Sequence, residues 1–458
     1  MSLKKLLRVL AVLLLMAVFT APLFGKGSEE YRNPEMVIVN MADTHSAYDT
    51  YPRILGAVEQ ISEVVDHRTI VFLFDGDLFE LGNAAARKSA GLADWEFLSR
   101  LRNYGPVIVN IGNHEFDFVS PQEFIDTARL YGIVVIGTVR RAADGTLLAP
   151  EYVDLTAGPY TVRVIGIATN QINTYPKDYR EALQIPDPVE WIRANYRAIA
   201  SRVDYSILLS HAGLTADVAL LPALPDSTLF AVGAHDHLTL RQEVAGVPYM
   251  HNGFCGERLN VAAVYLEGST PRVVFRDVLS EEITGSDAAM AATIASVRRQ
   301  YLDAEDNAVV GRVPEDMSVL EAATWAVETV RDAVGADVAF LNHTSFGSGL
   351  QAGPLQRYRF DKFMRFDNDV MRATVSADTL RTILGKSNQH LLSSVEGRSG
   401  DFLYSSDVTV REGRQYTIVT SSWVALDFNQ QRNLGTTASF EKVQGVTTKN
   451  LLLAELNK

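Results

Sequence analysis

Short apolar runs alternate with helix-like stretches from Met36 to about Glu267, and this alternation is the feature that most limits how the chain can fold. Runs rich in valine, isoleucine and phenylalanine are typical of buried strands, so the pattern predicts an α/β fold. The runs are EMVIVN, TIVFLFDGD, GPVIVNIGN, VRVIGIA, DYSILLSHA and STLFAVGAHDH. Because open α/β sheets place their sites at the carboxyl ends of strands, we expect the polar residues that follow such runs to converge on one edge.

A second α/β block follows the first. The chain has 458 residues, of which 47% are hydrophobic and 21% charged, a globular composition that excludes a disordered or low-complexity protein. The runs ADVAFLN, DVMRATV and YTIVTSS alternate with helical patterns after Val309, and the stretch 286–306 before them is polar and helical. We therefore expect a first domain over 34–285, a solvated linking helix over 286–308 and a smaller second domain over 309–458.

The N-terminal segment has the pattern of a secretory signal peptide. Lys4, Lys5 and Arg8 precede an unbroken apolar run over residues 9–19, which is shorter than the roughly 20 residues that a spanning helix needs. We expect residues 1–25 to be removed and the protein to be periplasmic or secreted. The alternative is an uncleaved membrane anchor, and apart from export the sequence predicts no membrane association.

Net charge and cysteine content exclude further classes. The formal net charge of the full chain is −13, and loss of the three leader cations takes it to −16, which disfavours binding to nucleic acid polymers. Cys255 is the single cysteine, so the chain has no intrachain disulfide, no cysteine-rich metal site and no lipid attachment point after the leader. The oligomeric state is not indicated by the sequence.

Two strand ends carry side chains of the kind that bind metals. In MADTHSA, Asp43 and His45 stand two residues apart, so both side chains leave the same face. In FDGDLFE, Asp77 follows Gly76, where a carboxylate can bridge two cations and glycine permits close backbone approach. The alternative interpretations are a loop cap for the first pair and a helix N-cap for Asp77.

The segment NIGNHEFD combines a candidate ligand with a candidate acid. Asn113 offers a neutral carbonyl oxygen, and His114 offers an imidazole beside it. Asp117 follows three residues later and can orient that imidazole through its ring N–H. A pair of this kind suits a general acid, so we predict that His114 and Asp117 are catalytic.

Three more histidines follow buried runs. LLSHAG presents His211, and GAHDH presents His235 and His237 two residues apart. One strand-end histidine is usually structural, but five such segments in succession favour a single metal site. Mixed nitrogen and oxygen ligands suit zinc, manganese, iron or cobalt rather than calcium.

The order Asp-x-His, Gly-Asp, Gly-Asn-His-Glu-Phe-Asp, Ser-His-x-Gly and Gly-x-His-x-His resembles that of the calcineurin-type metallophosphoesterases. The Glu115–Phe116–Asp117 ending and the appended block are similar to the bacterial periplasmic 5′-nucleotidase / UDP-sugar hydrolase family. This resemblance covers nearly the whole chain after the leader. It implies a four-layer α-β-β-α metallophosphoesterase domain followed by a C-terminal α/β 5′-nucleotidase-type domain.

Carried over by position, the resemblance implies two divalent metal ions. Asp43, His45 and His237 would hold one ion, and Asp77 would bridge both. Three residues would complete the other site: Asn113, His211 and His235. Two such ions polarise a phosphoryl oxygen and activate a water for in-line attack, while a protonated His114 neutralises developing charge.

The second domain departs from the family pattern where the substrate would bind. The family loop Asn-Gly-Gly-Gly-Ile-Arg corresponds to NHTSFGSG, which keeps Asn342 but has Gly347 in place of the arginine. The family segment Pro-Phe-Gly-Asn appears as RFDN, with Arg365 in place of proline. Other arginines can replace the lost charge unless they are ordinary solvated side chains: Arg357, Arg359 and Arg372.

Aromatic residues stack the base in nucleotidase relatives. Phe402 and Phe428 fall near the corresponding positions, so the resemblance implies that they bind substrate together with Asn342. The alternative for both phenylalanines is ordinary core packing.

Two classes of function remain open from the sequence. The first is an exported dinuclear-metal phosphoesterase, most simply a 5′-nucleotidase, although the substrate can also be another phosphomonoester, a cyclic nucleotide or a sulfur-linked conjugate. The second is a binding protein that keeps the fold with a remodelled pocket. The intact ligand set and the His114–Asp117 pair favour catalysis, whereas the altered loop after Asn342 favours a changed substrate.

Overall fold

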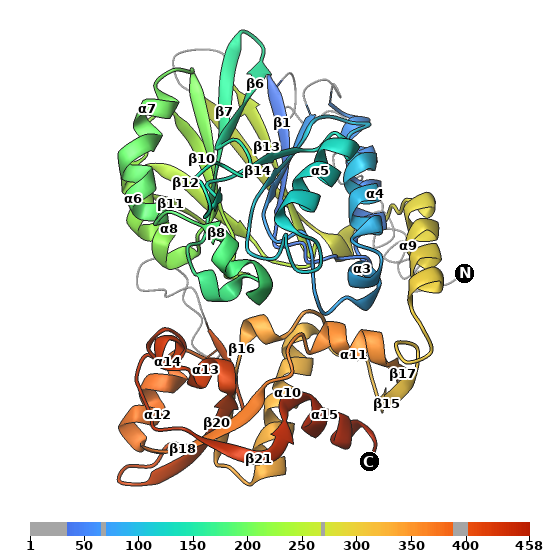
Figure 1. Cartoon of the computed structure of the whole chain (residues 1–458), viewed down its shortest axis with the longest axis vertical. Helices are drawn as coiled ribbons and strands as arrows, with labels where there is room; N and C mark the ends of the chain where they lie inside the picture. Colours follow the sequence, from blue (N-terminus) through green and yellow to red (C-terminus); the bar gives the residue numbers. More distant parts are fainter. Residues whose placement is uncertain (1–33, 66–69, 267–270, 388–401) are drawn as a thin grey trace, which may run out of the picture.

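The computed structural model describes residues 34–65, 70–266, 271–387 and 402–458. It has two α/β domains, one above the other in Figure 1, and so confirms the predicted fold class. The expected signal peptide, residues 1–25, lies outside the described residues. Within the described part, no helix has both the length and the apolar character that a membrane crossing requires.

The first domain contains two six-stranded sheets. The order in the first sheet is β14-β13-β1-β2-β3-β4, with β1 to β4 parallel and β13 and β14 forming an antiparallel extension at one edge. Its strands are β1 (Met36–Ala42), β2 (Ile70–Asp75), β3 (Val107–Asn110), β4 (Val134–Ile136), β13 (Arg258–Tyr265) and β14 (Arg272–Leu279). Four of these strands are uniformly buried or nearly so, which explains their continuous apolar sequence.

The order in the second sheet is β11-β12-β10-β9-β7-β6, with a parallel centre and antiparallel edges. Its strands are β6 (Tyr152–Ala157), β7 (Tyr160–Ala168), β9 (Tyr205–His211), β10 (Thr228–Gly233), β11 (Thr239–Val244) and β12 (Val247–Asn252). The edge strands β6 and β11 alternate between exposed and half-buried residues, because one of their faces meets solvent. A short pair, β5 (Arg140–Arg141) and β8 (Leu183–Gln184), lies outside both sheets.

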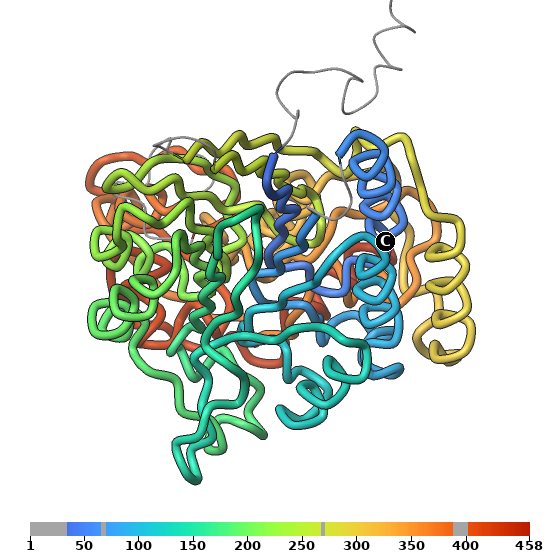
Figure 2. The backbone as a smooth tube through the Cα atoms, turned by 90° about the horizontal axis from the view of Figure 1, so that it is seen from above, coloured from blue at the N-terminus to red at the C-terminus, as the bar shows by residue number. Residues whose placement is uncertain are grey.

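The two sheets pack face to face, and helices cover their outer faces. Between the sheets lies an apolar layer that includes Ile38 and Leu73 from one sheet and Val164 and Leu209 from the other. The first sheet is covered by α2 (Tyr51–Ser62), α3 (Ala84–Lys88), α4 (Leu92–Leu101), α5 (Pro121–Tyr131) and α9 (Ala288–Tyr301). The second is covered by α6 (Pro188–Trp191), the π-helical turn Ile192–Tyr196, α7 (Arg197–Ala200) and α8 (Leu214–Leu220). Figure 2 shows the two helical layers on opposite sides, which is the predicted α-β-β-α arrangement.

Helix α9 differs from the sequence-based expectation of a solvated linker. It ends at Tyr301, and Met290, Ile294 and Val297 are buried in the core of the first domain. These positions recur at helical spacing and form one apolar stripe, so only the opposite face of the helix meets solvent.

The second domain is built on a five-stranded sheet of order β19-β16-β20-β18-β21. Its strands are β16 (Val338–Asn342), β18 (Asp369–Ser376), β19 (Leu403–Ser405), β20 (Gln415–Ser421) and β21 (Glu441–Thr447). One face packs on α10 (Val319–Val334), α11 (Arg357–Phe363) and α15 (Thr448–Leu456), and the other on α12 (Ala377–Leu384), α13 (Ser422–Ala425) and α14 (Asp427–Leu434). The strands β15 (Val309–Val313) and β17 (Gly353–Gln356) form a separate pair. Helix α11 lies against α3, so this domain faces the strand ends of the first.

Candidate metal centre

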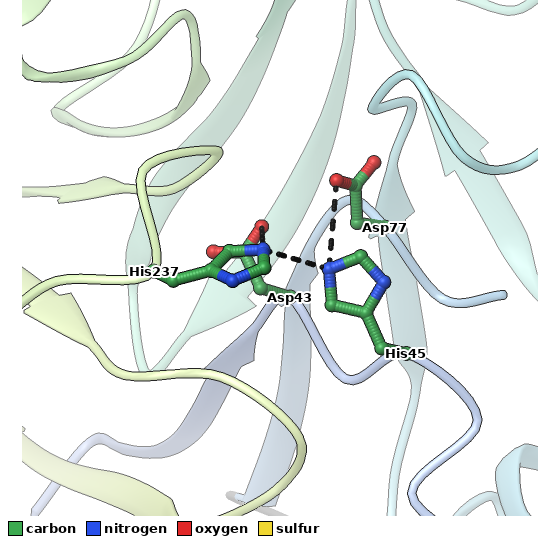
Figure 3. A group of neighbouring side chains, drawn as sticks. All are labelled: Asp43, His45, Asp77 and His237. Atoms are coloured by element: carbon green, nitrogen blue, oxygen red, sulfur yellow. Dashed lines mark hydrogen bonds and ion pairs between the residues drawn. The ribbon is translucent and has the colours of Figure 1, made fainter. Parts of the chain in front are cut away.

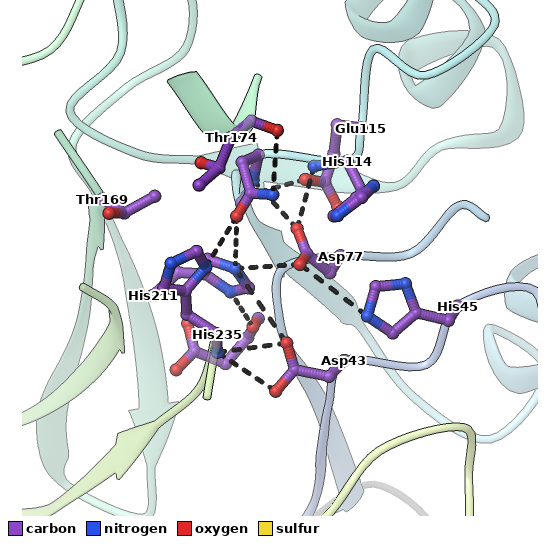
Figure 4. Close-up of polar contacts among 12 residues, drawn as sticks. Asp43, His45, Asp77, His114, Glu115, Thr169, Thr174, His211 and His235 are labelled. Atoms are coloured by element: carbon purple, nitrogen blue, oxygen red, sulfur yellow. Dashed lines mark hydrogen bonds and ion pairs between the residues drawn. The ribbon is translucent and has the colours of Figure 1, made fainter. Parts of the chain in front are cut away.

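Seven predicted ligands come together where strands of the two sheets end (Figures 3 and 4). Asp43 and His45 follow β1, Asp77 follows β2, and His211 ends β9. His235 and His237 follow β10, and Asn113 follows β3. All seven side chains are buried, so their polar groups need partners inside the protein.

The backbone at this edge adopts conformations that few side chains favour. Five of the seven residues have φ between 46° and 76°: Asp43, His45, Asp77, His235 and His237. Non-glycine residues in this left-handed region cost about 1–3 kcal/mol each, and such strain collects at functional sites. The fold is therefore less stable than it would be with ordinary backbone conformations here, and the strained backbone orients these side chains.

The first cluster contains Asp43, His45, Asp77 and His237 (Figure 3). The Nε2 atoms of His45 and His237 face each other at 2.9 Å. Asp77 Oδ2 lies 3.8 Å from Nε2 of His45, and Asp43 Oδ1 lies 4.0 Å from Nε2 of His237. Two imidazole nitrogens and two carboxylate oxygens thus point at one small space.

The second cluster shares Asp77 with the first. Asp77 Oδ2 lies 3.2 Å from Nε2 of His211, and the Asn113 side-chain oxygen lies 2.8 Å from Nδ1 of His235. The same oxygen lies 3.3 Å from Nε2 of His211. One Asp77 oxygen therefore borders both groups, 3.8 Å from Nε2 of His45 and 3.2 Å from Nε2 of His211.

The protonation state and the tautomer of the cluster histidines suit them to metal binding. Burial holds the pKa values of His45 and His237 well below the usual range, and it lowers the pKa of His235 to about 3. These rings are therefore neutral and keep a lone pair. His45 places Nδ1 3.2 Å from the Phe79 carbonyl, which favours the tautomer whose Nε2 is free to bind a metal.

His211 and the two acids complete the electrostatics. Burial opposes charge on His211, but Asp77 and Asp43 hold its pKa well above the usual range. Burial raises the pKa of Asp43, whereas His211 and His114 overcome burial and keep the pKa of Asp77 low. His211 places Nδ1 2.8 Å from the Asp75 carbonyl, so Nε2 faces the cluster. Two divalent cations would replace the proton on His211 and relieve the repulsion between the acids.

Two glycines leave the space that the cluster occupies. A Cβ on Gly76 would lie 2.4 Å from Nδ1 of His211, and one on Gly112 would lie 2.4 Å from Oδ1 of Asp77. Both distances are far below van der Waals contact, so only glycine, which has no Cβ, fits at these two positions. With the donor set, this close fit shows that the residues present suit the two metal ions that the resemblance implies.

Glu115 joins the two loops that carry Asp77 and Asn113. Its buried carboxylate accepts hydrogen bonds from the backbone N–H groups of Leu78 at 2.8 Å and Gly112 at 2.7 Å. The sequence analysis used Glu115 only to recognise a motif and missed this positioning role.

The predicted catalytic pair is formed. His114 Nδ1 lies 2.9 Å from Asp117 Oδ2, which also accepts from the Leu81 backbone N–H. Burial opposes charge on the ring, but Asp117 and Asp77 raise the pKa of His114 to about 9. This raised pKa favours the protonated ring, whose Nε2 is directed away from Asp117.

A cavity of about 320 Å³ lies between the domains and opens on both clusters and on His114. Asn342 lines it, together with Trp423 and Phe366 from the second domain. Among the described residues that line the cavity, neither Phe402 nor Phe428 occurs.

The two predicted aromatic residues lie elsewhere. The Phe402 ring stacks on His343 at a centroid distance of 3.9 Å, and Phe428 is 56% exposed. His343 replaces a glycine of the family loop, which was visible in the sequence. Its imidazole ring covers one face of Phe402. Its contact with Phe402 depends on tertiary packing and has no local signal.

The lysine and arginine side chains that line the cavity also differ from the arginines that the sequence analysis considered. The lining includes Lys177, Arg180, Arg365 and Arg432. The arginines named from the sequence are not part of this lining: Arg357, Arg359 and Arg372. The replacement of proline by Arg365 in RFDN was the one available signal.

Comparisons with known proteins agree with this geometry. Residues 36–239 match the family model of the calcineurin-like phosphoesterases. The first domain therefore matches the calcineurin-like phosphoesterases in both sequence and ligand arrangement, and this match supports a metal-dependent phosphoester hydrolase. No curated protein sequence matches the chain.

Solved structures resemble the chain over almost its whole length. A 5′-nucleotidase precursor from Thermus thermophilus is 17% identical, with 92% of this chain and 96% of that chain covered and a TM-score of 0.63. The sulfate thiohydrolase SoxB from Thermus thermophilus is 11% identical, with 93% and 94% covered and a TM-score of 0.67. A 5′-nucleotidase from Candida albicans is 15% identical, with 94% and 100% covered and a TM-score of 0.63. These likenesses confirm the two-domain fold expected from the 5′-nucleotidase resemblance.

Proposed function

We propose that the protein is an exported dinuclear-metal phosphomonoesterase of the 5′-nucleotidase type, which releases inorganic phosphate from small phosphate esters. One observation carries the proposal: two ligand clusters that share Asp77 open on the same cavity as the His114–Asp117 pair. A divalent metal pair and a protonated imidazole on one cavity are the groups that phosphoryl transfer to water requires.

The protein groups have separate roles in this proposal. Asp77 and six further residues would hold the ions, which would polarise the phosphoryl group and lower the pKa of the attacking water. His114 presents its Nε2 proton to the substrate and neutralises charge on the departing oxygen. Asp117 keeps the ring oriented and protonated through Nδ1. A protein that only binds a ligand has no need of this pair, which argues against the binding-protein alternative.

A non-nucleotide leaving group is a second candidate, and the Phe402 contact favours it. His343 covers one face of Phe402, and His343 itself is fixed by Nε2 at 2.6 Å from the Asp236 carbonyl. Stacking of a base on that face would require both contacts to break. The cavity lining instead offers Trp423, Phe366 and several carboxamides to the leaving group.

An assay of the purified protein tests the proposal. The protein is loaded with manganese, zinc or cobalt and given an aryl phosphate, nucleoside monophosphates, nucleotide sugars, cyclic nucleotides and a thiosulfonate conjugate. We expect metal-dependent phosphate release from the phosphomonoesters and loss of that release in His114→Ala. No phosphate release from any ester with any of the metals would refute the proposed function.

A further inference from the structure

Arg365 belongs to the second domain, and its buried cation lies beside the candidate metal centre of the first domain. Its side chain is only 2% exposed, although it borders the cavity between the domains. A charge buried to this extent needs partners, and its contacts show what it can still bind.

The guanidinium of Arg365 is held by two partners. Its Nε pairs with Glu80 Oε2 at 2.5 Å, and its Nη1 donates to the Thr344 carbonyl at 3.1 Å. Glu80 is itself held, because Oε1 accepts from the Gly82 backbone N–H at 2.7 Å. The guanidinium is therefore rigid, and rigid donors bind anions with little loss of entropy.

The remaining amino group, Nη2, points at the reaction site. It lies 3.5 Å from Nε2 of His114 and 3.3 Å from Nδ1 of His45. The His45 Nδ1 atom faces the Phe79 carbonyl, so its proton is directed there. Nη2 and the inner edge of His114 thus border the same space, into which a phosphoryl oxygen can accept from both.

Gly347 makes this placement possible. The segment 345–347 pairs with 363–365 through the bonds Arg365 N–H to Ser345 carbonyl, 2.9 Å, and Gly347 N–H to Phe363 carbonyl, 3.0 Å. A Cβ on Gly347 would lie 3.2 Å from Cγ and 3.3 Å from Cδ of Arg365, and 2.5 Å from the Lys362 carbonyl. The glycine that stands where the sequence comparison expects an arginine therefore leaves room for the stem of Arg365.

We propose that Arg365 binds the phosphoryl group of the substrate, supplying from a different position the positive charge that Gly347 cannot provide. This rests on the proposed function, since it names a further phosphoryl-binding residue at the same site. Glu80 acts as a positioning residue that holds the guanidinium in place.

The test measures binding of inorganic phosphate to the manganese-loaded protein by calorimetry, without turnover. Arg365→Met should weaken phosphate binding about 10- to 100-fold, the range expected for a hydrogen bond to a charged group. Arg365→Lys should recover part of the loss as a point charge without the fork geometry. Arg359→Met, on the preceding helix α11 but outside the cavity lining, is the control and should bind phosphate as the unaltered protein does.

Glu80→Gln separates phosphate binding from a purely structural role of the ion pair. It breaks the pair but keeps the cation, so it should weaken phosphate binding less than Arg365→Met does. The double variant Glu80→Gln/Arg365→Met leaves no orphaned charge and should match Arg365→Met, with metal content and melting temperature recorded for every protein. Unchanged phosphate affinity in Arg365→Met, or equal losses in Glu80→Gln and Arg365→Met, would overturn the inference. Because phosphate binding needs no turnover, a failure of the proposed function would appear separately, as an unaltered protein that binds phosphate but hydrolyses no ester.

Discussion

Replacement of Asp117 by asparagine isolates what the carboxylate does for His114. The change keeps the size of the side chain, and an amide oxygen can still accept from the Leu81 backbone N–H, which Asp117 binds at 2.8 Å. What is lost is the negative charge 2.9 Å from Nδ1 of His114, between two side chains that are only 15% and 6% exposed.

The size and sign of the effect follow from this contact. A hydrogen bond to a charged group is worth about 1.5–3 kcal/mol, which corresponds to about one to two pKa units. Asp117 raises the pKa of His114, so its removal lowers that pKa. In the proposed function His114 acts in its protonated form, so activity should fall as pH rises through this pKa. The alkaline limb of the pH profile should therefore move down by about one to two pH units in Asp117→Asn.

The measurement is kcat against pH for an aryl phosphate, in both proteins and with the same metal. Bound cations lower the pKa of His114 in both, so the difference between the two profiles reports Asp117 alone. Asp126→Asn, an exposed acid that pairs with Arg129, is the matched control and should leave the profile unchanged. An alkaline limb at the same pH in Asp117→Asn would refute the assignment of His114 as the acid.

Three further predictions concern the same site. Asp77→Asn should lower the bound metal more than any other single ligand change, because Asp77 borders both clusters; elemental analysis that finds one site still full would contradict this. His114→Ala should lower kcat about 10²- to 10⁴-fold with metal content unchanged, and loss of metal would show that His114 is a ligand. Phe402→Ala should leave KM for adenosine monophosphate and for an aryl phosphate within about threefold of the unaltered protein, because His343 covers the ring; a rise of about tenfold or more for the nucleotide alone would show that Phe402 stacks the base.

Six of the twelve strands in the two sheets were predicted, because buried parallel strands carry continuous apolar sequence: β1, β2, β3, β7, β9 and β10. The edge strands β6 and β11 were not, since each alternates between exposed and half-buried residues and lacks such a run. The polarity of α9 suggested a solvated linker, although three spaced apolar residues fix it to the core. Composition over a helix is less informative than the position of its few apolar residues.

The metal clusters were predictable because their ligands follow strands that end at one edge, so local motifs imply proximity. The residues that line the cavity on the second domain were not predictable, because their placement depends on contacts between distant segments. Arg365 reaches the cavity only through the pairing of 345–347 with 363–365, and Phe402 is covered only through the packing of His343. Neither of these tertiary contacts has a local sequence signal, although the replacement of proline by Arg365 in RFDN was itself visible.

A metal titration tests the central claim most directly. The protein is stripped with a chelator, manganese is added back in steps, and bound metal per chain and aryl phosphate hydrolysis are measured on the same samples. Two clusters that share Asp77 predict that the stripped protein is inactive and that activity reaches its maximum at two ions per chain. Full activity in the stripped protein, or a maximum at one ion, would contradict the dinuclear site.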